Sequence, residues 1–441
     1  MPEPHARPVF GINHILAYGQ SLASGWEGVP ALSRGARHDS LMLGRSVRAG
    51  GEEASPDWQP LGGAVLRPLV ATEQRADGKL LDDAARAGAT PGPVEAEPGA
   101  IVLGETVLEE ALGHLRGRML AADPAAGLHK LLGSCCAVGG RGIEQLSRGA
   151  EPELFARLRA CASAARATAR GWGKTYGIPA VLLLQGENNS WGLDGATSDR
   201  DAYGALFARL IRDIATDVAA GIAGQAAPPA FVTYQTGGAY ASDDMAVPQA
   251  QLDVALGTAG VFLAAPVYPL PDRPTGHLRA DGYRWLGAQF GKVLASLFVD
   301  RRPWRPLHPI RAARDGDQVH VGFHVPVPPL VFGCPFIGAR RMAVPDQGFS
   351  VLDAAGMVPV QTVAITAAER VSLRLGRALT GAARLRYADR AHRGRGALHD
   401  SDARVAEVGF AGADLDAAEP GLLGTPYPLM NWCVGFDIAI G

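Results

Sequence analysis

The sequence has few cysteines and does not suggest a disulfide-bonded protein. Its 441 residues include five cysteines, at positions 135, 136, 161, 334 and 433, and no two of them form a C-x-x-C pair. An odd number of cysteines in so long a chain does not describe a disulfide framework, and the sequence contains no zinc ligand set. We therefore expect the cysteines mostly as small buried apolar residues in a reducing compartment.

Neither positively nor negatively charged residues are in large excess. The chain carries 42 Lys and Arg against 44 Asp and Glu. This balance argues against the broad cationic field of proteins that bind nucleic acid or anionic membranes non-specifically. A small neutral or mildly polar partner is favoured, and nothing in the sequence indicates the number of subunits.

Long apolar runs and targeting segments are also missing. No stretch approaches the roughly 18 to 20 apolar residues of a membrane span. The N-terminal sequence MPEPHARPVFG lacks the charged and apolar regions of a signal peptide, so a cytoplasmic location is expected, with secretion or association with a virion left open. No glycine loop followed by Lys-Ser/Thr is present to bind a nucleotide phosphate.

What is present is an alternation of strand and helix patterns. Five short apolar runs occupy residues 13–18, 128–132, 179–184, 229–234 and 261–266. Helical spacing of apolar residues appears between or after them, as in Leu108, Leu112, Leu115 and Met119, in Tyr203, Phe207, Leu210 and Ile214, and in Leu286, Phe290, Val293 and Leu297. Apolar runs of this length suit parallel strands that are covered on both faces. The sequence therefore predicts an α/β fold with a five-stranded parallel sheet.

Two regions depart from this rhythm. Residues 28–98 are rich in Gly, Pro and Ala with weak periodicity, which predicts a loop-like insertion. After the proline-rich joint at 301–306 the pattern changes to period two, as in Val319, Val321 and Phe323, which predicts antiparallel strands in a β-sandwich. We expect an α/β domain over residues 1–300 and a β-rich domain over residues 301–441. The sequence Arg393-Gly394-Arg395-Gly396 in the second domain predicts a solvated loop, with contact to a phosphate or a sugar acid as the alternative.

Gly19-Gln20-Ser21-Leu22 directly follows the first apolar run and makes Ser21 a candidate nucleophile. A serine hydroxyl needs a base to take its proton and donors to stabilise the oxyanion that it creates. The strict lipase pattern Gly-x-Ser-x-Gly is absent because Ala23 occupies its last position. The alternative role for Ser21 is to cap the helix that follows.

Two later segments offer oxyanion donors. Gly139-Gly140 presents backbone without a Cβ, although an ordinary turn would also explain it. Gln185-Gly186-Glu187-Asn188 follows a buried strand, and the Asn188 side chain could donate an N–H or cap the next helix. Because ligands bind at the carboxyl ends of parallel strands, these segments are expected to meet Ser21 there.

His277 is the candidate base among 11 histidines. It follows a turn-rich loop and precedes a long amphipathic helix. Asp272, five residues earlier, is the candidate carboxylate that fixes its tautomer. His320 and His324 share a strand face but would lie roughly 13 Å apart, too far to chelate one metal ion.

These segments, in this order, resemble the block pattern of the SGNH (GDSL-like) hydrolase superfamily. Gln20-Ser21, Gly139-Gly140 and Gln185-Gly186-Glu187 look most like its sialate O-acetylesterase-like branch, over roughly residues 11–299. The resemblance implies a three-layer α/β/α fold without metal or organic cofactor. It implies that Ser21 is the nucleophile, that Ser21, Gly140 and Asn188 form the oxyanion hole, and that His277 is the base. The family's acid usually stands three residues before the histidine, where this chain has Pro274.

The sequence therefore predicts a serine esterase that removes acetyl or another short acyl group from a carbohydrate. Gln20, Gly139, Gln185 and Glu187 would bind substrate or support the site. The acetyl preference comes from the resemblance alone. Two alternatives remain: a lipid or thioester hydrolase with residues 28–98 as an apolar lid, and a carbohydrate-binding or assembly protein with a degenerate site.

Overall fold

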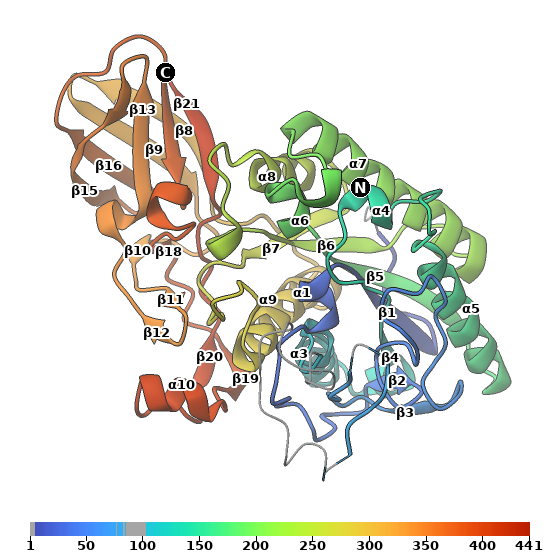
Figure 1. Ribbon diagram of the computed structural model, residues 1–441. Coiled ribbons are helices and arrows are strands. Elements are labelled where there is room, and N and C mark those ends of the chain that lie inside the picture. Colours follow the sequence, from blue (N-terminus) through green and yellow to red (C-terminus); the bar gives the residue numbers. More distant parts are fainter. Residues whose placement is uncertain (1–4, 76, 83, 85–102) are drawn as a thin grey trace.

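Two large β-sheets organise the part of the chain that the computed structural model describes, namely residues 5–75, 77–82, 84 and 103–441 (Figure 1). The first sheet has the strand order β3-β2-β4-β1-β5-β6-β7, and the second has the order β14-β13-β17-β21-β8-β9-β16-β15. Figure 1 shows helices on both sides of the first sheet, whereas the second sheet extends to one side of the molecule.

The first sheet consists of β1 (Ile12–Gly19), β2 (Leu41–Leu43), β3 (Leu66–Pro68), β4 (Lys130–Cys135), β5 (Tyr176–Leu184), β6 (Ala230–Gln235) and β7 (Val261–Pro266). The α-helices are α1 (Ser21–Ser24), α3 (Val107–Ala122), α4 (Ile143–Leu146), α5 (Ala156–Gly171), α6 (Glu187–Ser190), α7 (Arg200–Asp213), α8 (Ala246–Gly257), α9 (Ala280–Phe298) and α10 (Ala413–Ala418). A π-helix spans Ile214–Ala223, and short 3₁₀ helices span Pro124–Leu128, Leu193–Gly195, Gly238–Tyr240, Pro345–Gly348 and Arg390–His392.

The predicted parallel strands are present. The five apolar runs correspond to β1, β4, β5, β6 and β7, and neighbours in the order β4-β1-β5-β6-β7 pair in parallel. This is the 2-1-3-4-5 order of doubly wound sheets, whose ligands bind at the carboxyl ends of the strands where the order reverses. That point here lies between β1 and β5.

The sheet is larger than the sequence predicted, and the insertion is not only loop. Within residues 28–98, β2 pairs in parallel with β4, and β3 pairs antiparallel with β2. The prediction of five strands was wrong because each added strand has three residues, too few to show a period. The rest of this insertion was predicted as loop, and its residues 76, 83 and 85–98 lie outside the described residues.

Both faces of β1 are buried, each in its own core. Ile15 and Ala17 join a cluster with residues of α3 and α9, whereas Leu16 and Tyr18 join a cluster with residues of α5 and α7. Alternate residues of a strand point to opposite faces, so an unbroken apolar run is required where helices cover both.

The second sheet is formed by β8 (His308–Asp315), β9 (Gln318–His324), β13 (Phe349–Asp353), β14 (Gly356–Val358), β15 (Val360–Ala367), β16 (Arg370–Leu375), β17 (Ala383–Tyr387) and β21 (Phe436–Ile440). Smaller pairs join β10 (Val331–Phe332) to β18 (Leu398–His399), β11 (Phe336–Ile337) to β12 (Arg340–Arg341), and β19 (Val405–Gly409) to β20 (Pro426–Pro428). As the period-two pattern predicted, β9 pairs antiparallel with β8 and β16, and its Val319, Val321 and Phe323 are buried.

The C-terminal part of the chain returns to cover α9. The Trp285 ring of α9 stacks on Tyr427 with centroids 6.1 Å apart, and its Nε1 donates to the Pro428 carbonyl at 2.7 Å. Lys292 Nζ donates to the Leu429 carbonyl at 2.6 Å. One face of the last helix before residue 300 is therefore buried by residues beyond 400.

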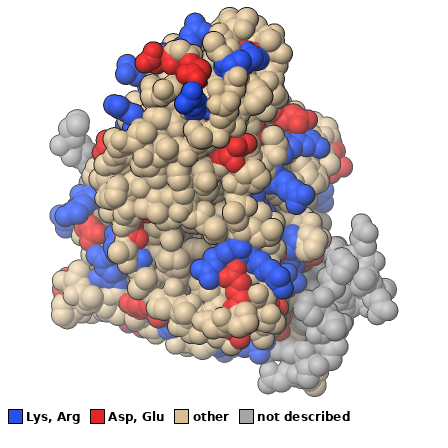
Figure 2. Space-filling model, turned by 90° about the vertical axis from the view of Figure 1, so that its left-hand side faces the viewer, with Lys and Arg blue, Asp and Glu red and all other residues tan. Residues whose placement is uncertain are grey.

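The surface is mixed in charge on the face that Figure 2 presents. Acidic and basic side chains are interspersed there among wide uncharged areas. None of the described helices combines the length and the apolar character needed to cross a bilayer.

Candidate functional site

Ser21 lies at a strand-to-helix turn at the end of β1. Gly19 ends the strand with φ of +142°, and a Cβ there would lie 1.9 Å from the Leu184 carbonyl oxygen of β5. Only glycine fits so close an approach. Gln20 then precedes α1. Ser21 is the first residue of this helix, and the Ser21 backbone N–H therefore has no acceptor within the helix.

The structure brings His277 to Ser21 across 256 positions of sequence. The His277 Nε2 atom lies 2.9 Å from the Ser21 Oγ atom, a hydrogen-bond distance. His277 lies in the loop between β7 and α9, and the Trp26 ring stacks on its imidazole at 6.0 Å between centroids. The candidate nucleophile and the candidate base are therefore in contact.

Glu27, which sequence reasoning did not single out, is the carboxylate beside the imidazole. Its Oε2 lies 3.5 Å from His277 Nδ1, an ion-pair distance longer than a well-formed hydrogen bond. Thr275 Oγ1 donates to the same oxygen at 2.5 Å. Burial alone would raise the pKa of Glu27, but its interactions with His277 and Thr275 outweigh that effect and lower the pKa below its ordinary value. Glu27 is therefore ionised at neutral pH.

Asp272, the carboxylate that the sequence suggested, has other partners. Its Oδ2 is paired with the Arg395 guanidinium, and its Oδ1 accepts from the Gly338 backbone N–H at 2.7 Å. Arg395 also donates to the Tyr268 carbonyl at 2.6 Å. The buried Asp272 thus ties the loop that carries His277 to two segments beyond residue 330, and the geometry places Glu27 rather than Asp272 at Nδ1.

Arg395 corrects one expectation. The Arg-Gly-Arg-Gly segment was predicted as solvated, whereas the Arg395 side chain is buried in its ion pair with Asp272. Nothing in the local pattern distinguishes Arg395 from Arg393, which is exposed.

Gln20 joins the end of β1 to the segment after β5. Its Oε1 atom lies 3.3 Å from each of three donors, namely Gln185 Nε2 and the backbone N–H groups of Gly186 and Asn188. Gln185 Nε2 also donates to Asn189 Oδ1 at 2.6 Å. Gln20 and Gln185, which the sequence predicted as supporting residues, thus bring two of the predicted site segments into one hydrogen-bonded network.

The candidate oxyanion donors occupy different settings. The Gly139 N–H donates to the Glu53 carboxylate at 3.1 Å, so it is already engaged. Gly140 follows in left-handed backbone with φ of +63° and is exposed. The Asn188 Nδ2 group has a long contact of 3.4 Å to the Leu193 carbonyl. The Val138 N–H donates to the Gly19 carbonyl at 3.0 Å, which holds the glycine segment beside the end of β1.

Glu187, the first residue of helix α6, is buried. The Tyr234 hydroxyl donates to its Oε1, and burial raises the pKa of its carboxyl group. No group of three or more His, Cys, Asp or Glu side chains within the described ranges is arranged to hold a metal ion.

A solved structure of another protein has a fold similar to that of this chain. No protein-family model matches the sequence, and no curated protein does either. Among solved structures, a carbohydrate acetylesterase from Xanthomonas citri matches with a TM-score of 0.55 and 16% sequence identity, over 97% of this chain and 80% of that one. A protein from Arabidopsis thaliana matches with a TM-score of 0.43 and 18% identity, over 65% of this chain and 99% of that one. The chain therefore shares its mixed α/β fold with a carbohydrate acetylesterase of known structure.

Proposed function

We propose that this protein is a serine-dependent carboxylic-ester hydrolase that removes acetyl or another short acyl group from a carbohydrate. The observation that carries the proposal is the 2.9 Å distance between Ser21 Oγ and His277 Nε2 at the carboxyl end of β1. The likeness in fold to a carbohydrate acetylesterase supports the choice of substrate class.

The proposed reaction has two steps. His277 Nε2 takes the Ser21 proton as Oγ attacks the ester carbonyl, and the imidazolium then protonates the departing sugar alkoxide. The resulting acyl-enzyme is hydrolysed when His277 activates a water molecule and returns the proton to Ser21. Acid and sugar alcohol are the products.

Glu27 is the proposed orienting carboxylate. A base of this kind needs its Nδ1–H held by an acceptor so that Nε2 is free to accept a proton. Glu27 lies at that nitrogen, and contacts of this kind often shorten when substrate binds. The role predicted for Asp272 passes, in this proposal, to Glu27, and Asp272 holds the loop.

The proposed oxyanion hole consists of the backbone N–H groups of Ser21 and Gly140 and the side-chain amide of Asn188. The free N–H at the start of α1 and the weakly engaged Asn188 amide support this assignment. In the same proposal the chain belongs to the SGNH superfamily, near its sialate O-acetylesterase-like branch. Residues 1–300 form its three-layer domain, and residues 301–441 form a sandwich-like domain.

The test is hydrolysis of p-nitrophenyl esters from acetate to decanoate by the wild type and by Ser21→Ala. We expect Ser21→Ala to lose roughly 10³-fold or more of the rate and to escape labelling by a fluorophosphonate. Equal rates for the two proteins would reject the nucleophile. A preference for long chains would favour a lipid hydrolase, and absence of both hydrolysis and labelling in the wild type would favour a binding protein.

A further inference from the structure

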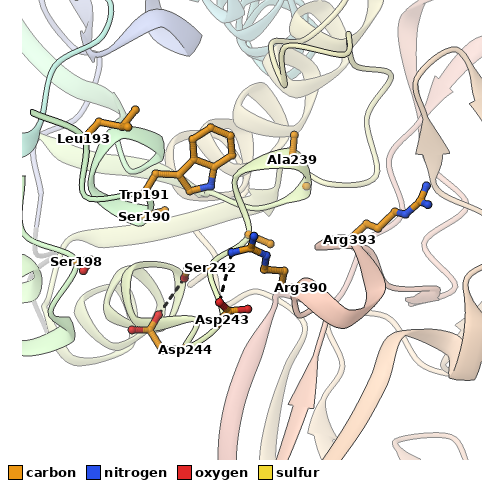
Figure 3. Close-up of a pocket in the computed structure, with 12 residues that line it drawn as sticks. Ser190, Trp191, Leu193, Ser198, Ala239, Ser242, Asp243, Asp244, Arg390 and Arg393 are labelled. Carbon is orange, nitrogen blue, oxygen red and sulfur yellow. Dashed lines mark hydrogen bonds and ion pairs between the residues drawn. The ribbon is translucent and has the colours of Figure 1, made fainter.

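A cavity of about 820 Å³ lies beside the candidate site (Figure 3). Its lining comes from three stretches of chain, within residues 190–198, 238–244 and 390–393. Small-molecule sites have volumes of roughly 300 to 1,000 Å³, so this cavity is far larger than an acetyl group requires.

The cavity walls adjoin the segments that carry the candidate catalytic groups, although neither Ser21 nor His277 lines it. Ser190, on one wall, ends helix α6 two residues after Asn188. On another wall, a Cβ on Gly276 would lie 3.1 Å from the Ala239 side chain, and Gly276 directly precedes His277. The cavity is therefore bounded by residues that adjoin the segments carrying Asn188 and His277.

Trp191 gives this cavity a large aromatic surface. Its side chain remains 51% exposed, and its ring lies 5.0 Å from that of Tyr240 at an angle of 45°. The Tyr240 hydroxyl donates to the Thr275 carbonyl at 3.0 Å, which holds the aromatic pair against the loop of His277. An exposed indole fixed in a concave site is a surface on which the C–H face of a sugar ring can stack.

The polar groups around the cavity carry no net charge. The lining includes hydroxyl groups of three serines, two carboxylates and two guanidinium groups. Arg390 lies 3.4 Å from Asp243, and Ser242 donates to Asp244 at 3.0 Å. In Figure 3 the remaining cation, Arg393, extends away from Trp191. Such a rim can exchange hydrogen bonds with sugar hydroxyls, and with zero net charge it offers no excess of cations to attract a sugar acid.

We propose that this cavity binds the saccharide part of the substrate, that the saccharide is neutral, and that Trp191 is its stacking platform. The inference rests on the proposed esterase function and adds a substrate class to it. Trp191 then determines specificity for the sugar, while Ser21 and His277 act on the ester.

The kinetic test compares Trp191→Ala with Trp172→Ala, a control in which a similarly exposed tryptophan, 56% accessible just after helix α5, is removed outside the cavity lining. The substrates are acetylated cello-oligosaccharides and p-nitrophenyl acetate. We expect Trp191→Ala to lower kcat/KM for the oligosaccharide roughly tenfold more than for p-nitrophenyl acetate, because only the oligosaccharide loses the stacked aromatic anchor, and tenfold corresponds to about 1.4 kcal/mol. Equal losses on the two substrates, or none on either, would overturn the proposal.

A binding test separates this proposal from the proposed function. The Ser21→Ala protein, alone and combined with Trp191→Ala or Trp172→Ala, is applied to an array of neutral, uronic-acid and sialylated oligosaccharides. Neutral oligosaccharides should bind, and only the Trp191→Ala combination should lose them. Absence of binding, binding indifferent to Trp191, or stronger binding of carboxylated sugars would reject the cavity assignment. Full esterase activity of Ser21→Ala would instead reject the nucleophile.

Discussion

At the scale of single residues, the partners of two carboxylates distinguish their roles. Asp272 lies five positions before His277 in the chain, but Glu27 is the carboxylate that faces the imidazole Nδ1. Asp272 is engaged by Arg395 and by the Gly338 N–H. An acceptor already saturated by a guanidinium and a backbone donor is poorly suited to orient a histidine.

Replacement of Glu27 tests this distinction. We expect Glu27→Gln to lower kcat for p-nitrophenyl acetate by roughly 10² to 10⁴-fold, because the amide no longer stabilises the imidazolium or fixes its tautomer. The measurement is steady-state kinetics, with Thr275→Val as the companion variant that removes only the supporting hydroxyl. A normal rate for Glu27→Gln, together with a loss of that size in Asp272→Asn, would return the orienting role to Asp272.

At the scale of elements, the loop between β7 and α9 is held from outside the first sheet. Asp272 and Arg395 form a buried ion pair, and the Asp272 N–H donates to the Gly338 carbonyl at 3.2 Å. Breaking a buried pair leaves an unpaired charge in a poorly solvated setting, which makes such pairs sensitive to single substitutions.

For Arg395→Met we expect a loss of roughly 3 to 5 kcal/mol in the free energy of unfolding, because the Asp272 carboxylate stays buried without its partner. The matched control is Arg200→Met, which breaks an exposed ion pair with Asp253 and should cost about 1 kcal/mol or less. Urea unfolding measures both. The double variant Asp272→Asn/Arg395→Met should recover part of the loss. Equal losses of stability in Arg395→Met and Arg200→Met would contradict a stabilising role of the buried ion pair.

Lys292 on α9 leads to a prediction about pH. Burial lowers the pKa of its amine to about 7, while the unfolded chain keeps the ordinary value of about 10.4. Between these values the unfolded state binds the extra proton, so the contribution of Lys292 to stability rises with pH, by up to about 1.4 kcal/mol per unit.

Unfolding in urea at pH 7, 8 and 9 measures this effect. The stability of the wild type minus that of Lys292→Met should increase with pH, since Met carries no proton in either state and the other titrating groups cancel in the difference. A difference that stays constant across this range would show that Lys292 is charged in the folded protein. Loss of its bonds to Leu429 and Asn431 lowers the stability of the variant at every pH.

At the scale of the whole molecule, the second sheet and the C-terminal segments complete the first part of the chain. Gln235 at the end of β6 donates to the Gly435 carbonyl at 2.9 Å and accepts from the Gly435 N–H at 2.7 Å. Tyr268 donates to the Cys433 carbonyl at 2.8 Å. These contacts lie at the carboxyl end of the first sheet, the same edge as the candidate site.

A chain ended at residue 300 should therefore fail to fold cooperatively. It would expose the Trp285 face of α9 and leave Asp272 and Lys292 without the partners that they now have. Circular dichroism during thermal unfolding measures this, with the full chain as reference. A sharp transition combined with normal hydrolysis of p-nitrophenyl acetate would show that residues 1–300 are an independent domain.

Local patterns were enough to predict much of the first sheet. The five parallel strands and helices α3, α7 and α9 follow from apolar runs and helical spacing, which depend on neighbours in sequence. Ser21 and His277 could be paired because parallel strands present their carboxyl ends at one edge. The short strands β2 and β3 carry no such signal, and their formation depends on pairing at the edge of β4.

The sequence by itself determined where the five long parallel strands and the main helices form and which serine and histidine could meet, because apolar periodicity and strand direction depend on residues close together in the chain. Only the tertiary structure decided which carboxylate faces His277, that Arg395 is buried, and that Trp191 stands open in a cavity. These outcomes depend on the packing of residues more than 100 positions apart, as Asp272 and Arg395 are. A charged side chain is ionised, paired or solvated according to those distant neighbours, and a single sequence does not display them.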